Sequence, residues 1–398
     1  MTAAVQPSLE DPKDSWLVYA DALQAAGDPR GELIALSQAI EDGASPGDRD
    51  ALFERHAEAI FGSLAAHRAK LEIDWKWCVP RTLSVLIDPD DDVAAVIAAL
   101  LASPLATQMQ TLRLVARTPN DEKVELGPAV AALAEGLPEN CTDLELVDER
   151  ASKSRIIVSA DYSPDENLVD FGELEALWRI PQLRKLHLVV ADMTQVPLGE
   201  IDAPALEDFS FLGLRWGEGY SIPSETAEPL IEASWPKLRR LALRLPETLT
   251  YAWPEQDGAY VESERYDDYS NYYEQYEDDE GWHEDYDWAG ELRGLLAALK
   301  QTEIESLSLT SFASASNLLE ALEAGLPPTL VHLDLSGSDL GDDHVAWMVE
   351  HAEIFERLQT LDLRDTLIHN PSPLAALEPE VLHSDGGGAA YRFAVGME

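Results

Sequence analysis

A six-residue pattern, apolar-x-x-apolar-x-apolar, recurs along most of this 398-residue chain. In an extended segment these apolar residues share one face, because successive side chains of a strand point to opposite sides. One such strand cannot bury its apolar face alone, so many copies must stack side by side. The clear copies are MQTLRL, CTDLEL, LRKLHL, LEDFSF, LRRLAL, IESLSL, LVHLDL and LQTLDL, which begin at Met109, Cys141, Leu183, Leu206, Leu238, Ile304, Leu330 and Leu358, and a weaker candidate, TLSVLI, begins at Thr82.

The spacing of the copies is similar to that of leucine-rich repeats. Successive copies start 23 to 42 residues apart, except for one gap of 66 residues after Leu238, whereas leucine-rich repeats have a period of about 20 to 29 residues. The last two copies also place Ser338 and Thr366 where that family has a small hydrogen-bonding residue. Such a side chain satisfies backbone groups in the turn that leaves the strand.

The segments between the strands have helical spacing. In GDDHVAWMVEHAEIFERL, Asp342 or Asp343 is expected to cap a helix whose apolar residues include Val345 and Met348. The sequence therefore predicts an α/β solenoid over residues 73–398. Its expected shape is a leucine-rich-repeat horseshoe with strands on the concave face and helices on the convex face.

Residues 1–72 lack the repeat and predict a small all-helical domain. Ser15 precedes an apolar helix that Gly27 ends, and Asp28-Pro29 provides the N-cap and first-turn proline of the next helix. The string WLVYADALQAAGDPRGELIALSQAI, residues 16–40, resembles the repeat-companion domain found ahead of leucine-rich repeats in certain bacterial proteins. That resemblance implies a bacterial origin and brings no known activity with it.

The chain is strongly acidic, with 75 Asp and Glu against 28 Lys and Arg and a formal net charge of −47. This charge opposes binding to nucleic acid and to anionic membranes, and it steers a basic partner toward the protein. General solubility, or adaptation to a salty cytoplasm, is an alternative explanation. The sequence has neither a long apolar run nor an apolar signal-peptide core at its start, so a cytoplasmic location is expected.

The 66-residue gap contains an insertion, residues 251–290, that is rich in acids and aromatic residues. From Glu255 to Glu291 there are fifteen acids and one base, Arg265. Carboxylates interleaved with Tyr and Trp suit the docking of a basic peptide, whereas a solvated surface loop is the alternative. The candidate contact residues are Tyr266, Tyr269, Tyr272, Tyr273, Tyr276, Trp282, Tyr286 and Trp288.

Motifs for catalysis or for a resident cofactor are missing from the sequence. The nine histidines are scattered, without the spacing of metal ligands, and Cys78 and Cys141 belong to no C-x-x-C pair. We therefore expect no enzyme activity, no cofactor and no metal site, and two free buried thiols.

The side chains between the repeated apolar residues are expected to line the concave face, because neighbours on a strand alternate. The leading hypothesis is a non-catalytic module that binds a protein or peptide partner through this face, the insertion, or both. The second hypothesis is an acidic chaperone or mimic that masks a strongly basic protein. The sequence indicates no particular oligomeric state. The candidate concave residues are Arg113, Glu145, Lys185, His187, Asp208, Arg240, Ser308, His332, Asp334 and Asp362.

Overall fold

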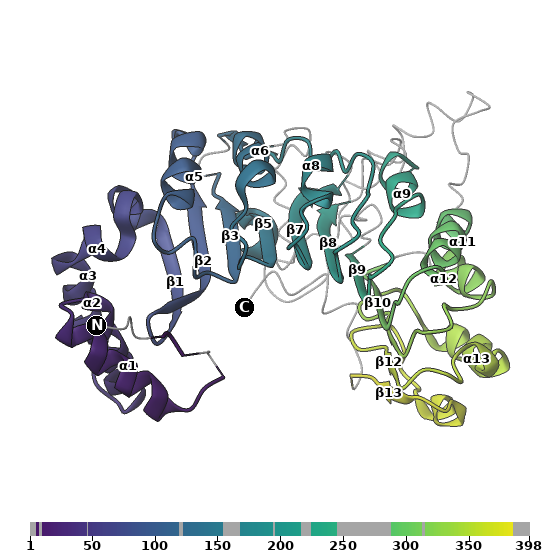
Figure 1. Cartoon of the computed structure of the whole chain (residues 1–398). Coiled ribbons are helices and arrows are strands. Elements are labelled where there is room, and N and C mark those ends of the chain that lie inside the picture. The colour runs from purple at the N-terminus through teal and green to yellow at the C-terminus, as the bar shows by residue number, and fades with distance from the viewer. Residues whose placement is uncertain are drawn as a thin grey trace, which may run out of the picture.

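The protein is an arc with strands along its inner side and helices along its outer side (Figure 1). The computed structural model describes residues 5–7, 10–45, 47–118, 122–153, 168–193, 196–215, 224–244, 288–312 and 315–384. The predicted α/β solenoid is therefore the observed architecture. Its inner side is the concave face of the arc.

The described strands form one large sheet of eleven strands in the order β1-β2-β3-β5-β7-β8-β9-β10-β11-β12-β13, and a second pair, β4-β6. In the large sheet β1 and β2 are antiparallel, and every later neighbour is parallel. The strands are β1 (Leu71–Lys76), β2 (Val79–Ile87), β3 (Thr111–Ala116), β4 (Val124–Glu125), β5 (Asp143–Asp148), β6 (Val169–Asp170), β7 (Lys185–Asp192), β8 (Asp208–Arg215), β9 (Arg240–Arg244), β10 (Ser306–Thr310), β11 (His332–Asp334), β12 (Thr360–Asp362) and β13 (Glu380–Leu382).

All eight strands predicted from the six-residue pattern are present, and the weaker candidate at Thr82 lies within β2. The pattern does not predict β1 or β13, the two edge strands of the large sheet. Neither has the full set of repeated apolar residues, since β1 has the sequence LEIDWK and β13 the sequence EVL. Terminal repeats of solenoids commonly depart from the repeat pattern in this way.

Helices follow most strands and cover the outer side of the sheet (Figure 1). No helix among the described residues is both long and apolar enough to cross a membrane. The helices of the repeats are α5 (Val93–Leu101), α6 (Gly127–Gly136), α7 (Glu149–Lys153), α8 (Glu175–Trp178), α9 (Ser224–Ile231), α11 (Trp288–Leu299), α12 (Ala315–Leu322) and α13 (Asp342–Glu350), with the short 3₁₀ helices η4 (Ala352–Ile354) and η5 (Ser372–Ala376).

The core is built from ladders of apolar side chains that run across the strands. One ladder lies in register on consecutive strands, and each of its members is almost fully buried. At its centre the leucine is replaced by Phe209, which contacts Trp178, Phe211 and Trp235 with ring centroids 5.5 to 6.2 Å apart. This ladder consists of Leu83, Leu112, Leu144, Leu186, Phe209, Leu241, Leu307, Leu333 and Leu361.

Polar side chains connect neighbouring repeats at the turns. As predicted, Ser338 and Thr366 are buried and hydrogen-bonded to backbone, Ser338 Oγ to the N–H of Phe312 and Thr366 Oγ1 to a carbonyl of its own turn. The prediction that Asp342 or Asp343 caps α13 is wrong, since Gly341 is the N-cap. Asp342 Oδ1 instead accepts hydrogen bonds from the N–H groups of His369 and Asn370 in the next repeat.

The N-terminal helices pack onto the first strand pair of the sheet. They are α1 (Lys13–Ala25), α2 (Pro29–Glu41), α3 (Gly47–Arg55), α4 (Ala57–Phe61) and the 3₁₀ helix η1 (Gly62–Lys70). Trp16 of α1 stacks on Trp77 in the β1–β2 turn, with ring centroids 5.9 Å apart. The hydroxyl of Ser37 in α2 donates to the Trp77 carbonyl at 2.7 Å. Aromatic contacts therefore join the helices to the edge of the solenoid.

The Gly27-Asp28-Pro29-Arg30-Gly31 segment makes the tight turn between α1 and α2. Gly27 has a φ of +74°. The Asp28 carboxylate accepts a hydrogen bond from the Arg30 N–H and forms an ion pair with the Arg30 guanidinium. Gly31 allows the two helices to approach closely, because a Cβ on it would lie 2.6 Å from the Ala20 carbonyl oxygen. Gly31, which belongs to the residue 16–40 string, is thus needed for the close packing of α1 against α2.

The Gly31→Ala variant is expected to lower the free energy of unfolding by about 1–3 kcal/mol, because the added methyl group must push α1 and α2 apart. Gly47→Ala is the matched control, since the nearest atom to a Cβ on that residue would be Ser45 Oγ, 3.5 Å away. Urea unfolding followed by circular dichroism measures both. Equal stabilities for the two variants would contradict the close packing at Gly31.

Candidate binding face

Three rows of side chains run along the concave face, and neighbouring members of a row lie in register on adjacent strands. The first row is Thr82, Thr111, Asp143, Lys185, Asp208, Arg240, Ser306, His332, Thr360 and Glu380. The second row is Ser84, Arg113, Glu145, His187, Ser210, Ala242, Ser308, Asp334, Asp362 and Leu382. The third row is Leu86, Val115, Val147, Val189, Leu212, Arg244 and Thr310.

Every concave residue predicted from the sequence lies in the first or the second row. The parallel register brings residues that are far apart in the sequence onto neighbouring strands, about 4.8 Å apart. The predicted residues of the insertion lie outside the described residues, with the exception of Trp288, the first residue of α11. The concave rows therefore form the candidate site.

Opposite charges meet across neighbouring strands in the N-terminal half of the face. Lys185 Nζ lies 2.9 Å from Asp143 Oδ2, and Arg113 Nε lies 3.3 Å from Glu145 Oε2. Arg240 completes the set with Asp208, 3.5 Å away. Exposed pairs of this kind contribute about 0–1 kcal/mol to stability. They give this half of the face an alternating pattern of positive and negative groups.

The C-terminal half of the face is lined by hydroxyl groups and carboxylates. Ser308 Oγ donates to Asp334 Oδ2 at 2.8 Å, and His332 Nδ1 lies 3.2 Å from Thr360 Oγ1. Asp362 is almost fully buried, because it binds the N–H and the guanidinium of Arg364. Of the predicted contact residues, Asp362 thus presents the least surface, and it shapes the turn after β12.

His187 lies at the centre of the second row between Glu145 and Ser210. Desolvation by burial lowers the pKa of its imidazole below the usual 6.5, and the nearby carboxylates of Glu145 and Asp208 oppose that shift. A neutral imidazole can both donate and accept one hydrogen bond. His187 can therefore bind a polar group of a partner without adding charge.

The third row was not predicted from the sequence. The six-residue pattern ends at the last repeated apolar residue, whereas several strands continue for one or two residues beyond it. This row is apolar from Leu86 to Leu212 and then changes to Arg244 and Thr310. The sequence LRRLALR did contain a signal for this row. Arg240, Ala242 and Arg244 are two residues apart, so all three point to the same side of the strand.

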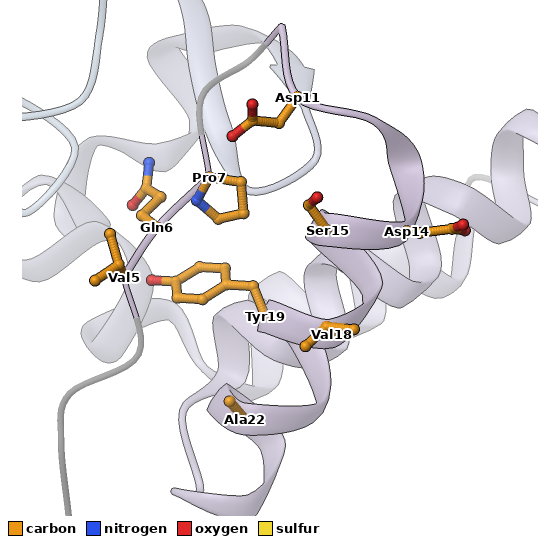
Figure 2. Close-up of a pocket in the computed structure, with 9 residues that line it drawn as sticks. All are labelled: Val5, Gln6, Pro7, Asp11, Asp14, Ser15, Val18, Tyr19 and Ala22. Carbon is orange, nitrogen blue, oxygen red and sulfur yellow. The ribbon is translucent and has the colours of Figure 1, made fainter.

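Two cavities lie among the N-terminal helices and the first repeat. One, of about 620 Å³, separates residues 5–7 from α1, and Tyr19 points across it toward Val5 and Pro7 (Figure 2). The other, of about 320 Å³, is lined by the Asp28–Arg30 pair, by Trp75 and by apolar side chains. Neither cavity is lined by a residue of the three rows. The candidate face therefore lies apart from these two cavities.

Both cysteines are buried and free, as the sequence predicted. Burial raises the pKa of the Cys78 thiol to about 11 and that of the Cys141 thiol to about 12. Thiols with such values carry little thiolate near neutral pH, and the thiolate is the nucleophilic form. Across the described part of the chain, no group of three His, Cys, Asp or Glu side chains is arranged to hold a metal ion.

The sequence matches no family model and no curated protein. The structure is similar to a crystal structure of a Bacteroides fragilis protein, with a TM-score of 0.50 and 12% identity over 73% of this chain and 70% of that one. It also matches TLR13 in its complex with ssRNA13, with a TM-score of 0.32 and 13% identity over 72% of this chain and 35% of that one. A chain of the mouse RP105/MD-1 complex matches with a TM-score of 0.27 and 14% identity, over 77% and 52%. At such identities the likeness concerns the fold alone.

The imidazole of His187 is expected to titrate with a midpoint below 6.5 in the folded protein. Since the folded pKa is lower than the unfolded one, the stability that this group contributes is complete above pH 6.5 and decreases as the pH falls through the folded pKa. Heteronuclear NMR of the imidazole gives the midpoint, and urea unfolding at several pH values gives the stability. A midpoint at or above 6.5 would show that the carboxylates outweigh burial, and His187→Gln should remove this part of the pH dependence.

Proposed function

We propose that the chain is a non-catalytic module that binds a protein or peptide partner through the concave face. The observation that supports this proposal most directly is the pattern of Lys185, Arg113 and Arg240, each beside a carboxylate of a neighbouring strand. Such an alternating pattern favours selective recognition, because a partner must match both signs of charge in the correct positions.

We assign the module to the bacterial cytoplasm and to the leucine-rich-repeat proteins that carry an N-terminal repeat-companion domain, residues 1–72. This assignment rests on the residue 16–40 string and on the order of the segments along the chain. The repeat period and the parallel sheet agree with it. The helical segment packs on the β1–β2 turn and covers one end of the solenoid.

The proposed partner is basic and is not a nucleic acid. The net charge of −47 repels phosphate backbones and attracts cationic proteins over roughly 8 Å at physiological salt. The acidic aromatic insertion is proposed as a second binding element, in which Tyr and Trp rings provide contact area and cation–π contacts for Lys or Arg.

A second candidate function is the masking of a strongly basic protein. It is favoured by the fifteen acids against one base between Glu255 and Glu291. In this case binding depends on bulk charge and decreases steeply with salt. Recognition by the paired charges of the concave face depends less on salt, because close pairs are screened less than distant ones.

The test is affinity capture from native extract at about 0.05 M and about 0.3 M sodium chloride. A double variant, Asp143→Lys with Lys185→Asp, keeps the ion pair but reverses its direction. We expect it to reduce capture of the partner about tenfold without changing the melting temperature, because the pair is retained while the pattern seen by the partner is inverted.

The matched control is the reversed pair Arg293→Glu with Glu320→Arg, which joins α11 and α12 on the outer side (Figure 1). It should leave capture unchanged. A further variant lacks residues 255–287 and keeps α11 intact. Loss of capture in this variant alone, together with loss at the higher salt, would favour masking over recognition by the face.

A further inference from the structure

Arg244 is the last residue of β9 and lies in the third row, between Leu212 of β8 and Thr310 of β10. It is partly buried, in contrast to Arg240, which is exposed on the same strand. Residues 240, 242 and 244 point to the same side of the strand, so the two guanidinium groups stand on either side of the small Ala242.

Arg244 differs from the other cations of the three rows in its partners. Arg113, Lys185 and Arg240 each lie within 3.5 Å of a carboxylate oxygen. Among the described residues, Arg244 has no carboxylate within ion-pair distance, and its pKa is lowered by desolvation alone. Its neighbours in register on the two adjacent strands are an apolar side chain and a hydroxyl.

An unpaired cation in a partly buried position is unfavourable for the free protein, because the charge loses hydration and gains no counter-charge. The chain has 75 acidic residues. Against such a composition, a concave-face arginine with no carboxylate partner among the described residues is a candidate position for an external anionic group. Arginine guanidinium binds planar oxyanions through two parallel hydrogen bonds.

The residues beside Arg244 in the second row have small side chains. Ser210, Ala242 and Ser308 are consecutive members of the second row, and all three have small side chains. Thr310, the neighbour of Arg244 in register on β10, adds a hydroxyl group. A hydroxyl can donate to the same oxyanion that the guanidinium binds.

We infer that Arg244 receives a carboxylate of the bound partner, either an Asp or Glu side chain or a C-terminal carboxylate. This inference rests on the proposed function, since it names a contact within the same concave face. A carboxylate is favoured over a phosphate group because a single guanidinium balances one negative charge, while the field of a −47 protein opposes the second charge of a phosphate dianion. The contact would select those basic partners that place one carboxylate at the centre of the face.

The experiment uses full-length protein labelled with ¹⁵N-arginine and acetate as the probe. The Nε–Hε resonance of Arg244 is assigned by its absence from Arg244→Met. We expect a saturable shift of this resonance with acetate, at least several-fold larger than the shifts of Arg113 and Arg240. Sodium chloride at the same ionic strength should not reproduce it. A shift no larger than that of the paired arginines, or a larger response to inorganic phosphate than to acetate, would overturn the assignment.

Stability gives a second readout that needs no ligand. Arg244→Met should melt at or above the temperature of the wild-type protein, because the variant removes an uncompensated charge. Arg240→Met, which breaks an exposed ion pair, should not gain stability. A fall in melting temperature for Arg244→Met alone would mean that the guanidinium already has a stabilising partner within the chain, which would overturn the inference.

Partner binding completes the test. Arg244→Met should weaken capture of the partner about tenfold or more, and Arg244→Lys should restore it in part, since lysine keeps the charge but not the paired hydrogen bonds. A partner captured equally by wild type and Arg244→Met overturns the contact. Because the acetate titration needs no partner, a failure to capture any partner contradicts the proposed function while the titration still decides the role of Arg244.

Discussion

The structure depends on the stacking of apolar side chains between parallel neighbours. Each repeat contributes a leucine or phenylalanine to the ladder, and the neighbouring repeats cover that side chain. Stability therefore comes from contacts between adjacent repeats. The register between the strands also decides which side chains are neighbours on the concave face. Lys185 meets Asp143 because Leu186 meets Leu144, and a shift of one residue would bury the charges and expose the leucines.

The parallel register also fixes the pattern of polar groups on the face. Its polar groups are fixed at intervals of about 4.8 Å across the strands and about 6.6 Å along them. Charges held in such a lattice can discriminate between partners by position, even where each pair contributes little energy. Phe209, Phe211, Trp178 and Trp235 pack together beneath the centre of the sheet. Ser210 lies between Phe209 and Phe211 on β8 and is in register with His187 on β7.

Much of the fold could be predicted from the sequence, because the repeated leucines report directly on which residues share a face. The strands from β3 to β12 were located in this way, apart from the short pair β4 and β6, and Ser338 and Thr366 were identified as turn residues. The sequence pattern did not predict the edge strands, which lack the repeated apolar residues; Trp75 of β1, for example, contacts Phe53 and Phe61 of the N-terminal helices instead. The sequence analysis also missed Arg244. Whether an arginine has a carboxylate within ion-pair distance depends on the residues of the neighbouring strands, which are distant in the sequence. The insertion lies outside the described residues, so its contact residues stay predictions.

The two ends of the large sheet differ from its interior in their pairing and in what covers them. At one end, β1 turns back antiparallel on β2, and Trp75 and Trp77 beside it are covered by Phe53, Phe61 and Trp16. At the other end, β13 pairs through three residues and carries the exposed Glu380. Long, flat, uncharged edges are templates for fibre formation, whereas short or charged edges resist it. Both ends of this elongated parallel sheet thus have features that disfavour edge-to-edge pairing with another sheet.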